Sequence, residues 1–200
     1  MRIAGIDPSL NNFGMAKGNL DFDQGRPVFD LAELYLQESK SDKANAKVVR
    51  KNSDDLNRAK TLHDALHRFI DDVELVIVEV PVGSQSARSM ASYGICVGIL
   101  ASIGVPMIQV TPTEVKLAAC QKKTASKGDM IEWATNMYPD AQWLRHKSKG
   151  EMVLGNKNEH LADAVAAVHA GMATETFNQL LAFRSSLRST HAHHPDTRRN

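Results

Sequence analysis

The chain has 200 residues, of which 42% are hydrophobic and 24% charged, and its formal net charge is +1. This length and composition fit one sizeable soluble domain with its own core, or a domain with a tail. The near-neutral charge excludes a uniformly basic nucleic-acid-binding protein, so any basic surface must be local. No apolar run is long enough to span a membrane.

Two features predict a cytoplasmic protein in a reducing compartment. Cys96 and Cys120 lie far apart in apolar contexts without metal-ligand spacing, which predicts reduced, buried thiols. Asp7 and Pro8 interrupt the apolar core that a signal peptide would need. We therefore expect a cytoplasmic protein.

The N-terminal residues 2–9 predict a buried strand that stops at Asp7, because Pro8 has no N–H to donate to a sheet. Ligands of α/β sheets gather at such strand ends, which makes Asp7 a candidate site residue. The alternative is that Asp-Pro-Ser merely starts a turn.

Two further strands are predicted at about residues 11–18 and 28–37, so the chain begins with a three-stranded meander. Residues 38–55 are polar and basic, and fit a solvated loop or a basic strip facing phosphates. Apolar spacing over residues 56–70 predicts an amphipathic helix. Its pair His63 and His67 lacks a third metal ligand, so an ordinary helix surface is favoured.

Residues 75–80 form a continuous β-branched run that predicts a central strand covered on both faces. Glu79 ends this run and is again followed closely by a proline, Pro81. A carboxylate in this position is costly to bury unless it is paired or binds a metal, which makes Glu79 a second candidate site residue.

Residues 87–103 predict a helix rich in small residues, with Gly94 and Gly98 four apart. Helical glycines cost stability, which indicates close packing against another backbone. That backbone is either the sheet or the same helix of a second subunit.

A short strand at 105–110 precedes two helices that start at Thr111-Pro112 and at Ser126. The basic connection between them carries Lys122, Lys123 and Lys127. Lysines and free N–H groups at a helix start suit phosphate binding, although a solvated turn is the alternative.

Residues 139–158 are predicted to be a loop. Its basic residues are Arg145, Lys147 and Lys149, and it could grip DNA. It could equally be a disordered insertion with Trp143 tucked onto the core. Residues 185–200 are polar without an apolar period, so we expect the domain to span 1–184 and the rest to be a disordered tail.

The last helix starts near residue 158 and carries Glu159, His160 and Asp163 on one face. Together with Asp7 and Glu79, these residues form a set of acids that would repel one another without a cation. Oxygen ligands suit Mg²⁺, and two ions about 4 Å apart can activate water and stabilise the leaving oxygen in phosphodiester cleavage.

Five short motifs occur in a distinctive order. They are Gly5-Ile6-Asp7-Pro8 with Gly14, Val78-Glu79, Val115-Lys116, Ala125-Ser126-Lys127 and His160-Leu161-Ala162-Asp163-Ala164. This order and spacing, over residues 1–172, resembles RuvC-type Holliday junction resolvases. The resemblance implies an α/β, RNase H-like fold: a five-stranded mixed sheet, with an antiparallel meander and two parallel strands, flanked by helices.

The resemblance also implies a function: a homodimer that resolves four-way DNA junctions in recombination and repair by paired nicks, using Mg²⁺ or Mn²⁺. Asp7, Glu79 and Asp163 would be metal ligands, and His160 would be the fourth catalytic residue, with Glu159 in reserve. Lys116 and Lys127 match lysines that face DNA, and the helix with Gly94 and Gly98 matches the dimer helix.

One departure from the family stands out. Val80-Pro81-Val82 replaces the aromatic residue that well-known bacterial members carry after the glutamate, which fits a divergent member such as a phage-type one. The alternatives are a broader nuclease for forks and flaps, and a non-catalytic nucleic-acid-binding module. A phosphotransfer enzyme is disfavoured because there is no GxxxxGK[ST] loop.

Overall fold

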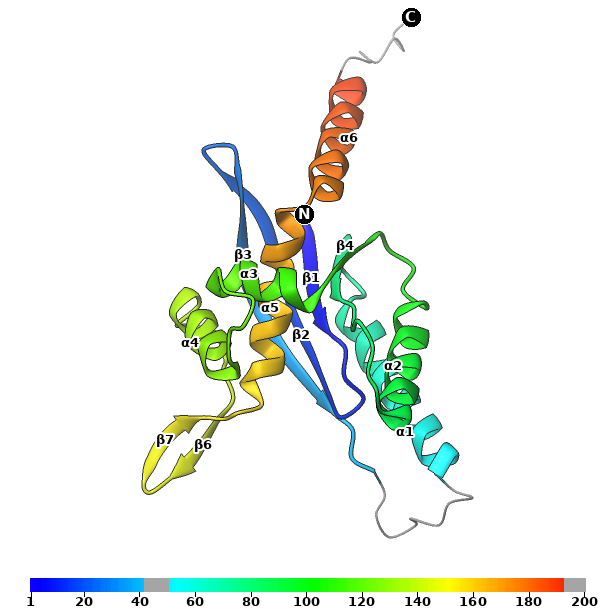
Figure 1. The fold of residues 1–200 in the computed structure, drawn as a ribbon. Helices are drawn as coiled ribbons and strands as arrows, with labels where there is room; N and C mark the ends of the chain where they lie inside the picture. The colour runs from blue at the N-terminus through cyan, green and yellow to red at the C-terminus, as the bar shows by residue number, and fades with distance from the viewer. Residues whose placement is uncertain (42–50, 193–200) are drawn as a thin grey trace, which may run out of the picture.

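The computed structural model describes residues 1–41 and 51–192, with side chains placed up to residue 186 except at 42–52. It has one five-stranded sheet with helices on both faces, and a small separate hairpin that projects from the body (Figure 1). The basic strip predicted within 38–55 lies largely outside the described residues.

The strands of the main sheet are β1 (Arg2–Asp7), β2 (Asn12–Asp23), β3 (Arg26–Glu38), β4 (Leu75–Glu79) and β5 (Met107–Val110). The hairpin consists of β6 (Arg145–Ser148) and β7 (Glu151–Leu154). The helices are α1 (Lys51–Phe69), α2 (Ala87–Leu100), α3 (Pro112–Cys120), α4 (Lys127–Met137), α5 (Asn158–Met172) and α6 (Glu175–Ala192).

The strand order of the main sheet is β3-β2-β1-β4-β5. Strands β1, β2 and β3 form the antiparallel meander, and β4 and β5 run parallel to β1. The predicted five-stranded mixed sheet is therefore confirmed.

Each face of the sheet has its own core. Ile3 and Ile77 point into the cluster covered by α5, whereas Ile6 and Val78 point into the cluster covered by α1 and α2. Strand β4 is buried on both faces because its β-branched side chains alternate between these two clusters, as its apolar run predicted.

The starts of α3 and α4 also follow the predicted signals. Thr111 and Ser126 each accept a hydrogen bond from the third residue of the helix, and Glu114 and Asp129 return the contact to complete a capping box. The Ser126 cap fixes the residue at which the α3–α4 connection, which carries Lys122, ends and α4 begins.

Three regions differ from the predictions. Helix α1 begins at Lys51, inside the expected loop. Residues 145–154 form a hairpin instead of a loop, because Lys149 and Gly150 take the positive φ values of a tight turn. Helix α6 continues through Ala192, so the expected disordered tail is wrong for residues 185–192. Within the described part of the chain, no helix is both long and apolar enough to cross a membrane.

A half-buried histidine, His169, joins α5 to the meander. Its ring packs edge-on against Phe29 and Trp133, and its Nε2–H donates to the hydroxyl of Tyr138 at 2.8 Å. That hydroxyl donates to the carbonyl of Phe29. Burial lowers the pKa of His169 from 6.5 to about 4.

We expect His169 to make the fold acid-sensitive. Between pH 6.5 and 4 the unfolded chain binds the proton more readily, so stability falls as pH falls, by about 3 kcal/mol. Urea unfolding between pH 6.5 and 4 should show that His169→Gln loses less free energy of unfolding than wild type. The control His63→Gln, whose side chain is exposed, should lose as much as wild type. Equal acid sensitivity of wild type and His169→Gln would contradict this assignment.

Candidate active site

The parallel pairing of β1 and β4 brings two carboxylates together. Ile6 lies opposite Val78 in this register, so Asp7 and Glu79, the next residues, follow at the same edge of the sheet. Each strand ends there because a proline follows closely, at Pro8 and Pro81. Both predicted strand-end acids are thus brought to one place.

Helix α5 crosses this edge at very close range because two glycines leave room for its backbone. A Cβ atom on Gly5 would lie 2.0 Å from the carbonyl oxygen of Ala164. A Cβ atom on Gly14 would lie 2.1 Å from the carbonyl oxygen of His160. Any side chain at either position would force the helix away from the sheet.

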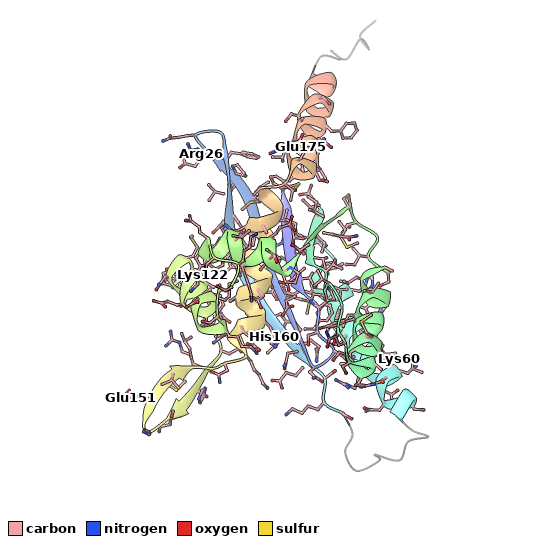
Figure 2. The ribbon with its side chains drawn as sticks, in the orientation of Figure 1. Arg26, Lys60, Lys122, Glu151, His160 and Glu175 are labelled. Carbon is pink, nitrogen blue, oxygen red and sulfur yellow. The ribbon has the colours of Figure 1, made fainter. Side chains whose placement is uncertain are left out.

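The first turns of α5 carry the next two site residues. His160 Nδ1 donates a hydrogen bond to Asp7 Oδ2 at 2.7 Å. Asp163 lies one turn further along, close enough for its charge to act on Glu79. The four residues predicted to be catalytic therefore converge from two strands and one helix, with His160 near the centre of the molecule in Figure 2.

Burial and mutual repulsion raise the pKa values of the acids. Burial, with the charges of Asp7 and Asp163, raises the pKa of Glu79 to about 8. Burial and the charge of Asp7 raise the pKa of Asp163 to about 7. Burial also raises the pKa of Asp7, although the hydrogen bond and charge of His160 act in the opposite direction. The positive charge around these acids therefore does not offset their burial and mutual repulsion.

His160 acts against this repulsion. Burial lowers its pKa, but the hydrogen bond to Asp7 and the charges of Asp7, Glu159 and Asp163 outweigh burial and raise it overall. Lys116 on α3 acts in the same sense, because its charge lowers the pKa values of both Glu79 and Asp163.

The reserve candidate Glu159 lies beside the same cluster. Its Oε1 is 3.4 Å from His160 Nε2, and its Oε2 is 2.8 Å from Lys127 Nζ. Lys127 is thus tied to the site through Glu159, even though its own side chain is 81% exposed.

The donor set fits a hard divalent cation. Carboxylate oxygens are the ligands that Mg²⁺ prefers, and the raised pKa values mark acids that lack a compensating charge. Within the described residues, no group of three or more His, Cys, Asp or Glu side chains is placed so that it could hold a metal ion. Asp7, Glu79 and Asp163, with His160, are the residues that would hold the metal.

The other predicted DNA-binding residues lie outside this cluster. Lys122 and Lys123 are exposed on the α3–α4 connection, and Lys122 is labelled in Figure 2. Arg145, Lys147 and Lys149 lie on the β6–β7 hairpin, whose far strand carries Glu151.

The sequence analysis missed a buried polar network that braces the loop after β1. Arg58 donates to the carbonyl of Leu10 at 3.1 Å and to Asn11 Oδ1 at 2.5 Å. Asp55 is buried beside Arg58 and accepts two hydrogen bonds from Arg88, at the start of α2. The signal was present, because Asp55 and Arg58 lie on the apolar face of α1, two turns and one turn before Leu62, respectively.

The loop between β4 and α2 begins with Val80-Pro81-Val82, the segment in which the sequence departs from the family resemblance. Val82 is 81% exposed there. It lies three residues beyond Glu79, next to the site.

The chain matches no family model and no curated protein sequence. Its structure is similar to that of Thermus thermophilus RuvC, with a TM-score of 0.56 and 21% identity over 85% of this chain and 92% of that one. RuvC of the same organism in complex with a Holliday junction substrate matches with the same TM-score and coverage at 18% identity. The yeast mitochondrial Holliday junction resolvase Ydc2 matches with a TM-score of 0.50 and 11% identity over 94% of this chain and 85% of that one.

These similarities establish the fold. The chain has the RNase H-like fold that is found in RuvC-type resolvases, as the ordered motifs predicted.

Proposed function

We propose that this protein is a metal-dependent, structure-selective DNA endonuclease that resolves four-way junctions by paired nicks. The observation that carries this proposal is the convergence of Asp7, Glu79, His160 and Asp163 at one edge of an RNase H-like sheet. In this proposal the nuclease domain is residues 1–184, and the last part of α6 extends beyond it.

The residues of the chain have separate tasks in this proposal. Asp7, Glu79 and Asp163 would hold Mg²⁺ or Mn²⁺, with two ions per site. Bound there, the ions supply an activated water and stabilise the leaving oxygen of the phosphodiester. The Asp7 hydrogen bond fixes the His160 ring through Nδ1. Nε2, which lies 3.4 Å from Glu159 Oε1, is the atom that would bind a cation or move a proton.

Four lysines would hold the phosphate backbone near the cut. Lys116 lies within electrostatic reach of the acids, and Lys127 pairs with Glu159 at the start of α4. Lys122 and Lys123 extend this basic edge along the α3–α4 connection. Lysines and helix N-termini are common phosphate contacts that position DNA without reading its sequence.

The exposed Val82 favours a second candidate, a broader nuclease for forks and flaps. An aliphatic side chain stacks less well on an opened base pair than an aromatic one does. Selectivity for the junction centre would then be weaker.

The test compares synthetic four-way, flap and linear duplex DNA, each with Mg²⁺, Mn²⁺ or EDTA. Paired, religatable nicks in the junction alone support the proposal. Cleavage of every branched DNA supports the broader nuclease instead. Tight binding without cleavage under any metal would contradict both and favour a non-catalytic module.

The partner that we propose for helix α2 is the same helix of a second copy. Gly94 and Gly98 are exposed, and a Cβ atom on either would meet nothing within 4 Å, so the sheet is not their packing partner. They line an apolar groove between α1 and α2 that also includes Leu56 and Ile95. The exposed Val97 extends this apolar surface.

We expect Gly98→Arg to dissociate this dimer without harming the fold, because open space surrounds the position and arginine favours helix over glycine. Analytical ultracentrifugation should shift from twice the 22.0 kDa protomer mass to the protomer mass. Asn178→Arg, at an exposed site on α6, should leave the dimer intact. A monomeric wild type, or an unchanged dimer in Gly98→Arg, would contradict the proposal.

A further inference from the structure

The β6–β7 hairpin projects from the body next to the N-terminal end of α5 (Figure 1). All four residues of β6 are exposed, and so are the first two residues of β7. A two-stranded hairpin is at best marginally stable alone, so burial does not explain why these strands form.

The two faces of the hairpin differ in charge. Arg145 pairs with Leu154, and Lys147 pairs with Met152, so these residues share one face. The opposite face carries His146 and the pair formed by Ser148 and Glu151. One face is thus basic with an exposed methionine, and the only acid of the hairpin lies on the other face.

The basic side chains are not neutralised within the described protein. Neither Arg145 nor Lys147 forms an ion pair with a described residue, and the same holds for Lys149 at the turn. Elsewhere Lys127 and Lys157 are paired with glutamates. The hairpin therefore presents free cations to an anionic partner.

The root of the hairpin is fixed to the helix that carries the site. Asn158, the first residue of α5, is fully buried, and its side chain binds both the N–H and the carbonyl of Leu144 at 2.8 Å. Gly155 N–H donates to the same carbonyl. His160 follows two residues after Asn158, so the root of the hairpin is tied to the helix that carries the site.

We infer that the basic face of the hairpin, with Arg145 and Lys147, binds the phosphate backbone of the duplex arm that leaves the active site. This inference rests on the proposed function, since it supplies the DNA. Four strand residues reach about 13 Å, the axial rise of about four nucleotides of one strand. The hairpin is therefore long enough to follow the cleaved arm beyond the lysines of α3 and α4.

The test measures equilibrium binding of the full chain to a four-way junction in EDTA, from about 50 to 300 mM salt. Arg145→Gln/Lys147→Gln should lower the log–log salt slope by about 2 and the affinity roughly 10-fold per lost contact at 0.1 M salt. Lys147→Gln alone should lower the slope by about 1.

The matched control is His146→Glu, which changes the charge by the same amount as Lys147→Gln but lies on the opposite face of the same strand. Its slope should equal that of wild type. Circular dichroism spectra of all variants should superimpose, because every substituted side chain is exposed.

The outcomes separate this inference from the proposed function. Wild-type cleavage with an unchanged salt slope in Arg145→Gln/Lys147→Gln overturns the hairpin contact alone. Equal loss of slope in His146→Glu and Lys147→Gln overturns the assignment to one face. Absence of DNA binding by the wild type overturns both the hairpin contact and the proposed function.

Discussion

Glu79→Gln is expected to abolish cleavage and at the same time to stabilise the metal-free protein. The amide removes a charged metal ligand, and several kcal/mol of transition-state stabilisation correspond to a loss of at least about 10³-fold in rate. The half-buried carboxylate, whose pKa is raised to about 8, destabilises the fold at neutral pH. Replacing the carboxylate with an amide should remove this cost of burying a charge.

The contribution of Glu79 to the free energy of unfolding should change with pH in a defined direction. Between the unfolded pKa of 4.5 and the folded pKa of about 8, the folded protein binds the proton more tightly, so its stability falls as pH rises. The loss is on the order of 3 kcal/mol by pH 7. In EDTA at pH 8, Glu79→Gln should melt roughly 4–8 °C above wild type, because the amide recovers part of that energy.

Thermal melts with and without Mg²⁺ measure both effects. Added Mg²⁺ should raise the Tm of wild type more than that of Glu79→Gln, since a cation that binds the folded state stabilises it. The control Glu132→Gln, at an exposed position on α4, should cleave and melt like wild type. Retained cleavage in Glu79→Gln would remove this residue from the site.

Gly5→Ala should have the largest effect on the fold. The added methyl would lie 2.0 Å from the carbonyl oxygen of Ala164 and 2.7 Å from Val168 Cγ2. Because the nearer atom belongs to a helix backbone, it cannot rotate away, and the cost should reach about 3 kcal/mol. That corresponds to a Tm lowered by roughly 6–12 °C in a chain of this size.

The same substitution should impair cleavage in the folded fraction. Lifting α5 off the sheet displaces Asp163 and His160 from Asp7, and a shift of about 1 Å can cost about 10²-fold in rate. Gly128→Ala is the matched control, since a Cβ atom there meets only Ser126 Oγ at 3.7 Å and alanine favours the helix. Gly5→Ala with unchanged Tm and rate would contradict the close docking of α5.

Much of the site could be predicted because its signals are local. Asp7 and Glu79 each end an apolar run near a proline, so they had to lie at strand ends. The family resemblance supplied His160 and Asp163. The sequence did not show that Gly5 and Gly14 admit the helix backbone, because that contact joins residues about 150 positions apart.

The hairpin was missed for a physical reason. Strands are recognised by alternating apolar residues, and Arg145-His146-Lys147-Ser148 has none. The turn is formed by the positive φ values at Lys149 and Gly150. A Lys-Gly pair is a weaker sequence signal for such a turn than Asn-Gly. The extension of α6 to Ala192 was missed similarly, since its second half lacks an apolar period.

The most direct test of the central claim is the cleavage of a four-way junction with two opposed strands labelled at different ends. The converging acids, one set in each copy of the proposed dimer, predict symmetric nicks in both strands with Mg²⁺ or Mn²⁺. No nicks are expected in EDTA or in Glu79→Gln, although that variant still binds the junction. Binding by the wild type without nicks at any cation concentration would contradict the proposed nuclease and leave the convergence of these side chains without a catalytic role.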